Sequence, residues 1–305
     1  MARGPPRHRE EVGAKRIATS STILGSTARL LLGGALALAI SGTVVGCGDS
    51  GGDVGSSTGT TTPSSSTSDA PTVTTGVYYT LDTRTGVRLA RELRDLPGDD
   101  PGVAAVEAMI AGPVDPDYAT TWNPDTEVLG VTESDGTIEV DLSAEARTAS
   151  VGSEGAALMV QQLVHTVTEA VDEDADVLML VDGEPAGELW GTLVWDEPVA
   201  RADPLDVRLL VQIDEPREGE TTSSPLRIEG EAAVFEATLL WRVLDESGAE
   251  VIAGSTMTAE GQTFAPFMFP VVLDPGTYVV EISEDDPSGG EGGTPMTDTR
   301  TVTIE

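Results

Sequence analysis

Cys47 is the only cysteine in the 305-residue chain, and its surroundings limit the chemistry open to its thiol. An apolar run, residues 30–45, comes before it, and a stretch with five arginines and one lysine comes before that run. A basic region, an apolar region and a small residue before the cleavage point are typical of a secretory signal peptide. Because the chain has no second cysteine, a disulfide bond within it is excluded.

Val44, Val45 and Gly46 lead into Cys47 in a pattern that resembles the lipobox of bacterial lipoproteins. The resemblance implies that residues 1–46 are removed and that the Cys47 sulfur forms a thioether to a diacylglycerol. Two or three acyl chains, at about 0.8 kcal/mol per buried methylene, would hold the protein on the outer face of the cell membrane. An uncleaved membrane anchor is the competing interpretation, although the apolar run has only 16 residues where a span needs roughly 20.

The chain after Gly46 is strongly acidic, and its charge limits the partners that it can bind. The whole chain has 17 Lys and Arg residues against 52 Asp and Glu residues. Residues 1–46 hold six of the basic and two of the acidic residues, so 11 and 50 remain, a formal charge of −39. Such a surface repels nucleic acid, which we exclude as a partner. Acidic residues are spread along the chain, which favours a solvated surface over a dedicated calcium site.

No residue pattern after the leader indicates catalysis. His165 is the only histidine there, and it lies in a helical pattern where we expect it on the domain surface. No Gly-x-Ser-x-Gly motif surrounds a serine. One histidine and one cysteine also exclude a zinc or copper site. We therefore expect no catalytic residue and no cofactor.

Asp172, Asp174 and Asp176 alternate as the carboxylates of a calcium loop do. Such a loop needs Gly at its sixth position and Glu at its twelfth, where this chain has Val177 and Gly183. The match is poor, and a solvated turn after a helix is the preferred interpretation. No metal site is expected here.

Residues 47–75 are dominated by Gly, Ser and Thr and predict a flexible tether, because they cannot bury enough apolar surface to fold. Order is expected from Val77. Asp135-Gly136 predicts a hairpin turn between two strands. The strands expected in this part of the chain span residues 77–81, 87–93, 127–132, 137–142 and 176–181.

Two helices are expected among these strands. Asp100 before Pro101 predicts the start of the first, and Gly112 its end. Ser153 is expected to cap the second. Its apolar face is predicted from residues that recur at intervals of three and four: Ala157, Val160, Val164, Val167 and Val171. Strands and helices in this order predict a compact α+β domain over residues 76–191.

Residues 192–204 are polar and contain prolines, which predicts an inter-domain linker. Every element expected in residues 205–305 is a strand, and about seven short strands predict an immunoglobulin-like β-sandwich. One strand should turn four residues toward the core: Ala237, Leu239, Trp241 and Val243. Residues 283–298 predict a mobile loop, whose acidic cluster 284–286 is a better surface for weak calcium binding than Asp172, Asp174 and Asp176.

Because the linker has few apolar residues, 76–191 and 205–305 are expected to fold separately.

Both halves resemble known families. VYYTLD, AMIAGP, TIEVDLS and VLMLVDGEP occur in the order and spacing of the GerMN domain of sporulation and spore-germination proteins, over about residues 76–191. VFEATLLWRVLD, within residues 205–305, resembles the Gmad-type immunoglobulin-like domain of bacterial spore germination, which often follows GerMN. The resemblance implies a non-catalytic binding or assembly module of the cell envelope. Some relatives build ring-shaped assemblies across membranes.

We therefore expect a lipid-anchored envelope protein that faces the outside of the cell and binds an envelope protein or a cell-wall component. The partner site is expected on the α+β domain, through its sheet edge or its helices. One alternative is an envelope carbohydrate hydrolase, which would need two carboxylates roughly 5–10 Å apart in a cleft. The other is a homo-oligomeric, ring-type structural component.

Replacing Cys47 with serine tests the anchor. Serine offers no sulfur for the thioether, so the Cys47→Ser protein should lose labelling by radioactive palmitate and keep its leader. The measurement is palmitate labelling of growing cells with an immunoblot for precursor size, and Ser50→Ala serves as a control that should label normally. Unchanged labelling of Cys47→Ser would contradict the lipobox interpretation.

Overall fold

The structure is a computed structural model that describes residues 71–286, 291 and 293–305. The predicted signal peptide, the lipobox, Cys47 and the tether up to residue 70 lie outside these residues. Strand structure begins at Thr72, earlier than the sequence predicts. Among the described residues, no helix is long and apolar enough to cross a membrane.

A long antiparallel hairpin comes first, with β1 over Thr72–Thr83 and β2 over Gly86–Pro97. Helix α1, Pro101–Ala111, follows it. The Asp100 carboxylate accepts a hydrogen bond from the backbone N–H of Val103 at 3.1 Å, so the predicted N-cap is confirmed. Gly112, with a φ of 100°, ends the helix as predicted.

A four-stranded sheet forms the other β layer of this half. Its order is β3 (Val128–Ser134), β4 (Thr137–Leu142), β5 (Asp176–Val181) and β6 (Glu184–Pro185). Asp135 and Gly136 turn with φ of 54° and 78°, which confirms the predicted hairpin. A short 3-10 helix, Ala144–Arg147, and helix α2, Ser153–Ala170, connect β4 to the parallel strand β5. The expected cap is wrong by one position, because Gly152 precedes the helix and offers no side-chain bond.

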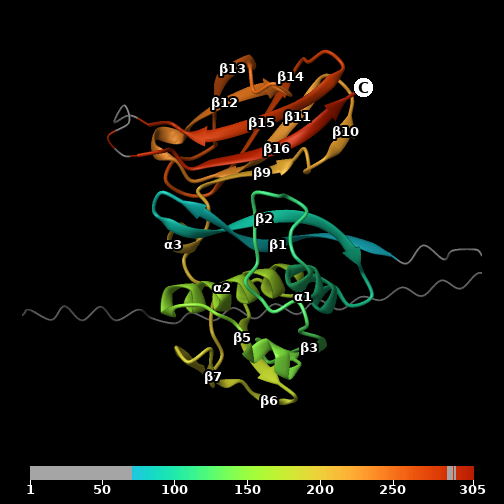
Figure 1. Cartoon of the computed structure of the whole chain (residues 1–305), viewed down its shortest axis with the longest axis vertical. Coiled ribbons are helices and arrows are strands. Elements are labelled where there is room, and N and C mark those ends of the chain that lie inside the picture. The colour runs from blue at the N-terminus through green and yellow to red at the C-terminus, as the bar shows by residue number, and fades with distance from the viewer. Residues whose placement is uncertain (1–70, 287–290, 292) are drawn as a thin grey trace, which may run out of the picture. The chain divides into compact units, whose positions relative to one another are not determined.

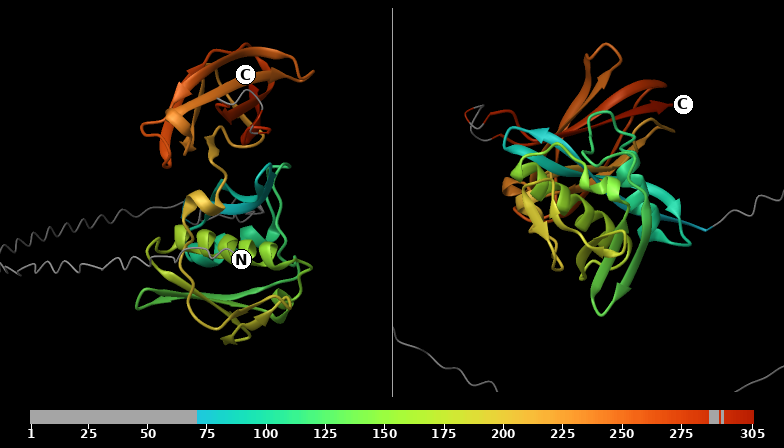
Figure 2. Two further views of the ribbon diagram at one scale, coloured as in Figure 1. Left: turned by 90° about the vertical axis from the view of Figure 1, so that its left-hand side faces the viewer. Right: turned by 60° about the horizontal axis from the view of Figure 1, so that its bottom comes forward.

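Helices α1 and α2 lie between the β1–β2 hairpin and the four-stranded sheet, so α2 is covered on two sides (Figures 1 and 2). Polar side chains of α2 bind the hairpin. The Gln162 amide donates to the carbonyl of Tyr78 at 2.9 Å, and the Thr166 hydroxyl accepts from the Tyr78 N–H at 3.1 Å. The Tyr78 hydroxyl donates to Glu169 at 2.6 Å. The predicted apolar face is buried at Val160, Val164 and Val167, whereas Ala157 and Val171, also predicted for it, are exposed.

His165 is buried, so its predicted surface position is wrong. Only 1% of the residue is exposed, and its ring centroid lies 5.1 Å from that of Tyr78. Among the described residues, neither ring nitrogen has a hydrogen-bond partner. Burial, helped by Arg201 and Arg208, lowers the pKa of His165 to about 3, so the ring is neutral in the fold. Helical periodicity reveals the stripe that faces the sheet but not the hairpin that covers the opposite face.

Residues 193–199 belong to the α+β fold and are not an extended linker. Strands β7, Gly187–Leu189, and β8, Leu193–Trp195, form a small hairpin, and Trp195 is 1% exposed. Val199 exchanges two backbone hydrogen bonds of 2.8 and 2.9 Å with Val177 and so extends the sheet beyond β5. Apolar side chains in a polar stretch therefore decide its structure. Helix α3, Pro204–Val207, leads out of this half.

Two sheets form the β-sandwich that the sequence predicts. One has the order β10-β16-β15-β12-β13 and the other the order β14-β11-β9. The predicted inward face of β12 is confirmed for three of its four residues, since Leu239 and Val243 are buried and Trp241 stacks on Phe269 at 5.0 Å between centroids. Ala237 lies in a 3-10 turn just before the strand, so its predicted place on the strand is wrong. The strands are β9 (Val211–Glu215), β10 (Glu220–Thr222), β11 (Leu226–Ala232), β12 (Thr238–Asp245), β13 (Glu250–Met257), β14 (Ala265–Val271), β15 (Gly276–Glu284) and β16 (Thr297–Ile304), with a 3-10 turn at Phe235–Ala237.

Backbone and amide groups join the sandwich to β2. The N–H of Leu209 donates to the carbonyl of Leu89 at 2.8 Å. The Gln212 side chain accepts from the N–H of Arg91 and donates to the carbonyl of the same residue, both at 2.7 Å. The segment that enters the sandwich thus occupies the outer edge of β2.

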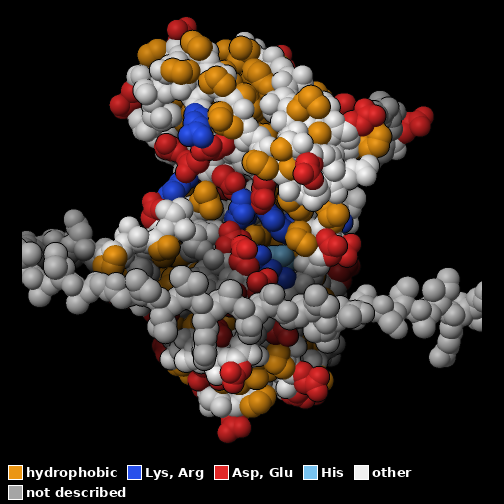
Figure 3. All heavy atoms as spheres, turned by 180° about the vertical axis from the view of Figure 1, so that it is seen from behind, with side chains coloured by type: hydrophobic (Ala, Val, Ile, Leu, Met, Phe, Trp, Pro, Cys, Tyr) orange, Lys and Arg blue, Asp and Glu red, His pale blue; other side chains and the backbone are white. Residues whose placement is uncertain are grey.

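Buried charges also cross this contact. Arg300 on β16 lies 2.8 Å from Asp115, in the loop after α1, and 2.9 Å from Asp298 on its own strand. The Tyr118 hydroxyl donates to Asp298 at 2.6 Å. All three charged residues are almost fully buried. In a second group, Arg91 of β2 pairs with Asp214 at 2.8 Å and with Glu231 at 2.9 Å, both in the sandwich. Figure 3 shows Arg side chains next to Asp and Glu side chains on one face of the molecule.

Acid should weaken the fold through His165. Its pKa of about 3 in the fold is below its ordinary value of 6.5, so the unfolded chain binds a proton that the folded chain excludes. Stability is therefore lost as pH falls from about 6.5 toward 3, by up to about 1.4 kcal/mol per pH unit. Urea unfolding of wild type and His165→Phe across this range should give a smaller pH slope for the variant. Equal slopes would contradict the assignment.

Candidate binding groove

A groove of about 610 Å³ opens over the N-terminal half of α2, and most of the residues that line it are apolar. Its volume is within the range of ligand sites in proteins. Its floor comes from α2, and its walls come from β2, α3 and the segment 193–202. The lining residues are Val87, Glu154, Gly155, Ala157, Leu158, Val160, Gln161, Leu193, Val194, Trp195, Val199, Ala202, Asp206 and Val207. We call this the α2 groove.

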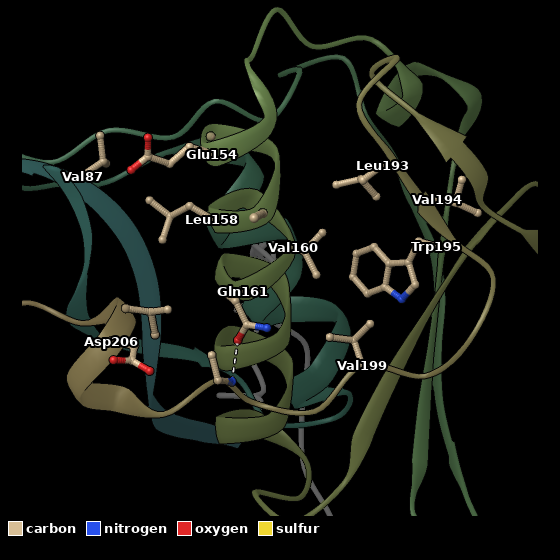
Figure 4. A pocket seen from close by; sticks show the side chains of 14 residues that line it. Val87, Glu154, Leu158, Val160, Gln161, Leu193, Val194, Trp195, Val199 and Asp206 are labelled. Carbon is tan, nitrogen blue, oxygen red and sulfur yellow. Dashed lines mark hydrogen bonds between the residues drawn. The ribbon is translucent and has the colours of Figure 1, made fainter. Parts of the chain in front are cut away.

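The two walls stand on opposite sides of the helix. Figure 4 shows Leu193, Trp195 and Val199 on one side of α2, with Val87 and Asp206 on the other. Val194 is 64% exposed, although it is a large apolar side chain. The buried Trp195 indole supports this wall from below and donates to the carbonyl of Val177 at 3.4 Å. The wall is thus an apolar surface on a packed base.

Gln161 fixes the segment that closes the groove. Its Oε1 accepts from the backbone N–H of Ala202 at 2.8 Å, the dashed line of Figure 4, and its Nε2 donates to the carbonyl of Ala200 at 3.2 Å. The amide is therefore used for structure, and it leaves the floor with few polar groups free to bind a ligand. Arg201 next to it reaches into α2 and donates to the His165 carbonyl at 3.0 Å.

The only charged residues that line the groove are Glu154 and Asp206, which lie on the same side as Val87 (Figure 4). The lining contains no Ser, Thr, Cys, His or Lys, so the carboxylates of Glu154 and Asp206 are its only candidate nucleophiles. Its one aromatic residue, Trp195, is 1% exposed and gives no open face for stacking a sugar ring. The chemistry of the groove is that of an apolar binding site with an acidic edge.

The other residues that the sequence singles out do not form a site. Asp172, Asp174 and Asp176 are exposed on the turn after α2, where Asp172 accepts from the N–H of Asp174. Glu284 pairs with Arg84, and the chain just before β16 is packed rather than loose, since Met296 is buried. Within the described residues, no group of three or more His, Cys, Asp or Glu side chains converges to hold a metal ion.

The lipobox residues Val44, Val45 and Gly46 and the acylation site Cys47 lie outside the described residues, so they stay predictions. Sequence reasoning missed the α2 groove, because the stretch that forms one wall was interpreted as a linker. The signal for it is the apolar run Leu193-Val194-Trp195 within that polar stretch.

Comparisons with known proteins agree with this architecture. Residues 76–187 match the family model described as sporulation and spore germination, and residues 210–291 match the immunoglobulin-like domain of bacterial spore germination. A comparison with curated proteins finds no relative.

Solved structures of low similarity include the tandem GerMN domains of the sporulation protein GerM from Bacillus subtilis. That match has 21% identity and a TM-score of 0.37, and it covers 43% of this chain and 46% of that one, so this chain spans less than half of its length. The first GerMN domain of the same protein matches at 24% identity and a TM-score of 0.35, and the match covers 43% of this chain and 99% of that one. A putative lipoprotein from Clostridium perfringens matches at 19% identity and a TM-score of 0.31, and the match covers 43% of this chain and 88% of that one. The two family-model matches assign residues 76–187 to the sporulation and spore-germination (GerMN) domain family, and residues 210–291 to the immunoglobulin-like domain family of bacterial spore germination.

Proposed function

We propose that this chain is a lipid-anchored, non-catalytic protein of the cell envelope that binds an apolar peptide segment of an envelope protein in the α2 groove. Cys47 would hold it on the outer face of the membrane, and residues 48–70 would give the folded part its reach. The observation that carries the proposal is the open apolar groove between α2 of the GerMN domain and residues 193–207, which follow the matched part.

Burial of apolar surface would drive binding. Val87 and Val194 are large apolar side chains left exposed on the two walls. Each apolar side chain of a partner that becomes fully buried contributes about 1.5–3 kcal/mol. The groove is open to solvent over the helix, which suits an extended or helical peptide better than an enclosed small molecule.

Charge would select among apolar partners. Glu154 and Asp206 place carboxylates at one side of the groove, on a chain whose formal charge is −35. Lys or Arg residues that flank the apolar segment would therefore be favoured, and acidic partners would be repelled. Such charges speed association more than they tighten it, so the expected affinity is modest.

The sheet edges of the same domain fit this role less well. Leu209 and Gln212 occupy the outer edge of β2. On the other side of the hairpin, Thr80 and Ala119 exchange backbone hydrogen bonds of 2.8 and 2.9 Å beside β1. Strand β3 is the edge that stays open on the four-stranded sheet among the described residues. A partner could instead bind at the β3 edge, and the experiment must distinguish binding there from binding in the α2 groove.

Site-specific photo-crosslinking in living cells separates the possible surfaces. A photoreactive phenylalanine would replace Val194 in the groove, Leu129 on β3 or Val272 on the sandwich. Val194 and Leu129 are comparably exposed, at 64% and 51%, so they form a matched pair. We expect a crosslink to one envelope protein from position 194, through an apolar peptide with a basic flank identified by mass spectrometry.

Leu158→Glu, which places a charge on the groove floor, should abolish that crosslink and leave the amount of protein unchanged. Capture from position 129 alone would move the site to the sheet edge. Capture from position 272 alone would assign binding to the sandwich and overturn the proposal. Ser153→Glu, which adds the same charge at an exposed position of α2 outside the groove lining, is the matched control and should leave the crosslink unchanged.

A further inference from the structure

The sandwich has four edge strands in the part of the chain that the structure describes, and three of them are protected. Strand β10 has three residues and pairs in parallel with β16. Strand β14 contains Pro266 and Pro270, which carry no N–H to offer a further strand. Short strands and prolines are the usual protection of sheet edges in natural proteins.

Strand β9 is protected by side chains. Asp298 accepts a hydrogen bond from the N–H of Ile213 at 2.7 Å, and Arg300 donates to the carbonyl of Ile213 at 2.8 Å. Gln212, the residue before it, binds the backbone of β2. The backbone N–H and C=O of Ile213, at the centre of β9, are therefore used within this chain.

Strand β13 has none of these protections. It spans eight residues and pairs only with β12. It contains no Pro, Lys or Arg, and its single charge is Glu250 at its start. Every residue of it except Thr256 is exposed, including Val251, Ile252 and Met257. A long, nearly uncharged edge is unexpected on a chain with 52 acidic residues, and it offers its unpaired backbone groups to another strand.

The position of Gly254 preserves this open edge. A Cβ atom there would lie 2.5 Å from the Trp241 ring, so the ring packs directly on the backbone of β13. Trp241 in turn stacks on Phe269. The centre of β13 is thus a flat stretch of small residues, Ala253-Gly254-Ser255, supported from inside the sandwich.

We propose that β13 pairs with β13 of a second copy of this chain, antiparallel about a twofold axis at Gly254, to join two sandwiches through one continuous sheet. In such a pair, opposite residues face the same side of the sheet, whereas neighbours along one strand face opposite sides. The twofold axis must therefore pass between a residue and its own copy, and not between a residue and the copy of its neighbour. With Gly254 at the axis, Ala253 lies opposite Ser255 and Ile252 opposite Thr256. The pair of Ile252 and Thr256 is β-branched, and such pairs favour strand association.

The two paired strands would bring few charges together, because each β13 carries only Glu250. The antiparallel arrangement puts the two Glu250 residues at opposite ends of the joined strands, about 27 Å apart at about 3.4 Å per residue. A parallel arrangement would place them side by side. The proposal is independent of the α2 groove, which lies on the other domain.

The test uses the chain from Ser65 to Glu305, a compact unit with its own internal contacts. Analytical ultracentrifugation at micromolar to hundred-micromolar concentration should show a dimer. Ala253→Lys/Ser255→Lys puts like charges opposite each other and should weaken the dimer at least tenfold. Met268→Lys on β14, a comparably exposed apolar position (58% against 66% for Met257), should leave it unchanged. Circular dichroism melts confirm that each variant is folded.

A covalent readout tests the register. Residues 65–305 contain no cysteine, so Ala253→Cys/Ser255→Cys should form a disulfide-linked dimer under mild oxidation at least ten times faster than Met268→Cys. A monomer at hundred-micromolar concentration, or a dimer that the lysine pair does not weaken, would overturn the proposal. A dimer that breaks with the lysine pair but does not crosslink would overturn the register at Gly254.

Discussion

A buried arginine between two buried aspartates is the interaction on which the rest of residues 71–305 depends. Arg300 lies against Asp298 on its own strand and against Asp115 on the GerMN domain. Burying such charges is costly unless they stay paired, and removal of one partner from a buried pair typically costs 3–5 kcal/mol. Burial accordingly raises the pKa of Asp115 to about 6, with Arg300 opposing that rise. The two domains must therefore stay in contact for these charges to remain paired.

This contact decides which surfaces are left for partners. It uses the outer edge of β2 through Leu209 and Gln212, and it uses the edge of β9 through Asp298 and Arg300. Among the described residues, the surfaces left open include the apolar α2 groove and the β3 edge on one domain and the β13 edge on the other. Our two proposals assign the groove to a partner and the β13 edge to a second copy of this chain, so one molecule would use both surfaces at once.

Local signals in the sequence predicted local structure well. Asp100-Pro101, Gly112 and Asp135-Gly136 each fix a backbone conformation by themselves, and both domain families could be identified from short motifs in order. Long-range packing was not accessible in the same way. His165 was expected on the domain surface, but it is buried under the hairpin, where Gln162 and Thr166 bind the backbone of Tyr78, over 80 positions earlier in the chain. The wall of the α2 groove was missed for a related reason. Residues 192–204 are polar on average, and this average conceals the apolar residues Leu193, Val194 and Trp195 that form the wall.

The central claim is that the two domains stabilise each other as one unit, although the composition of residues 192–204 suggested independence. Differential scanning calorimetry of residues 65–305, beside separately produced 76–191 and 205–305, tests it most directly. The account predicts one transition with equal calorimetric and van't Hoff enthalpies, at a higher temperature than either part alone. Two transitions at the temperatures of the separate parts would contradict it.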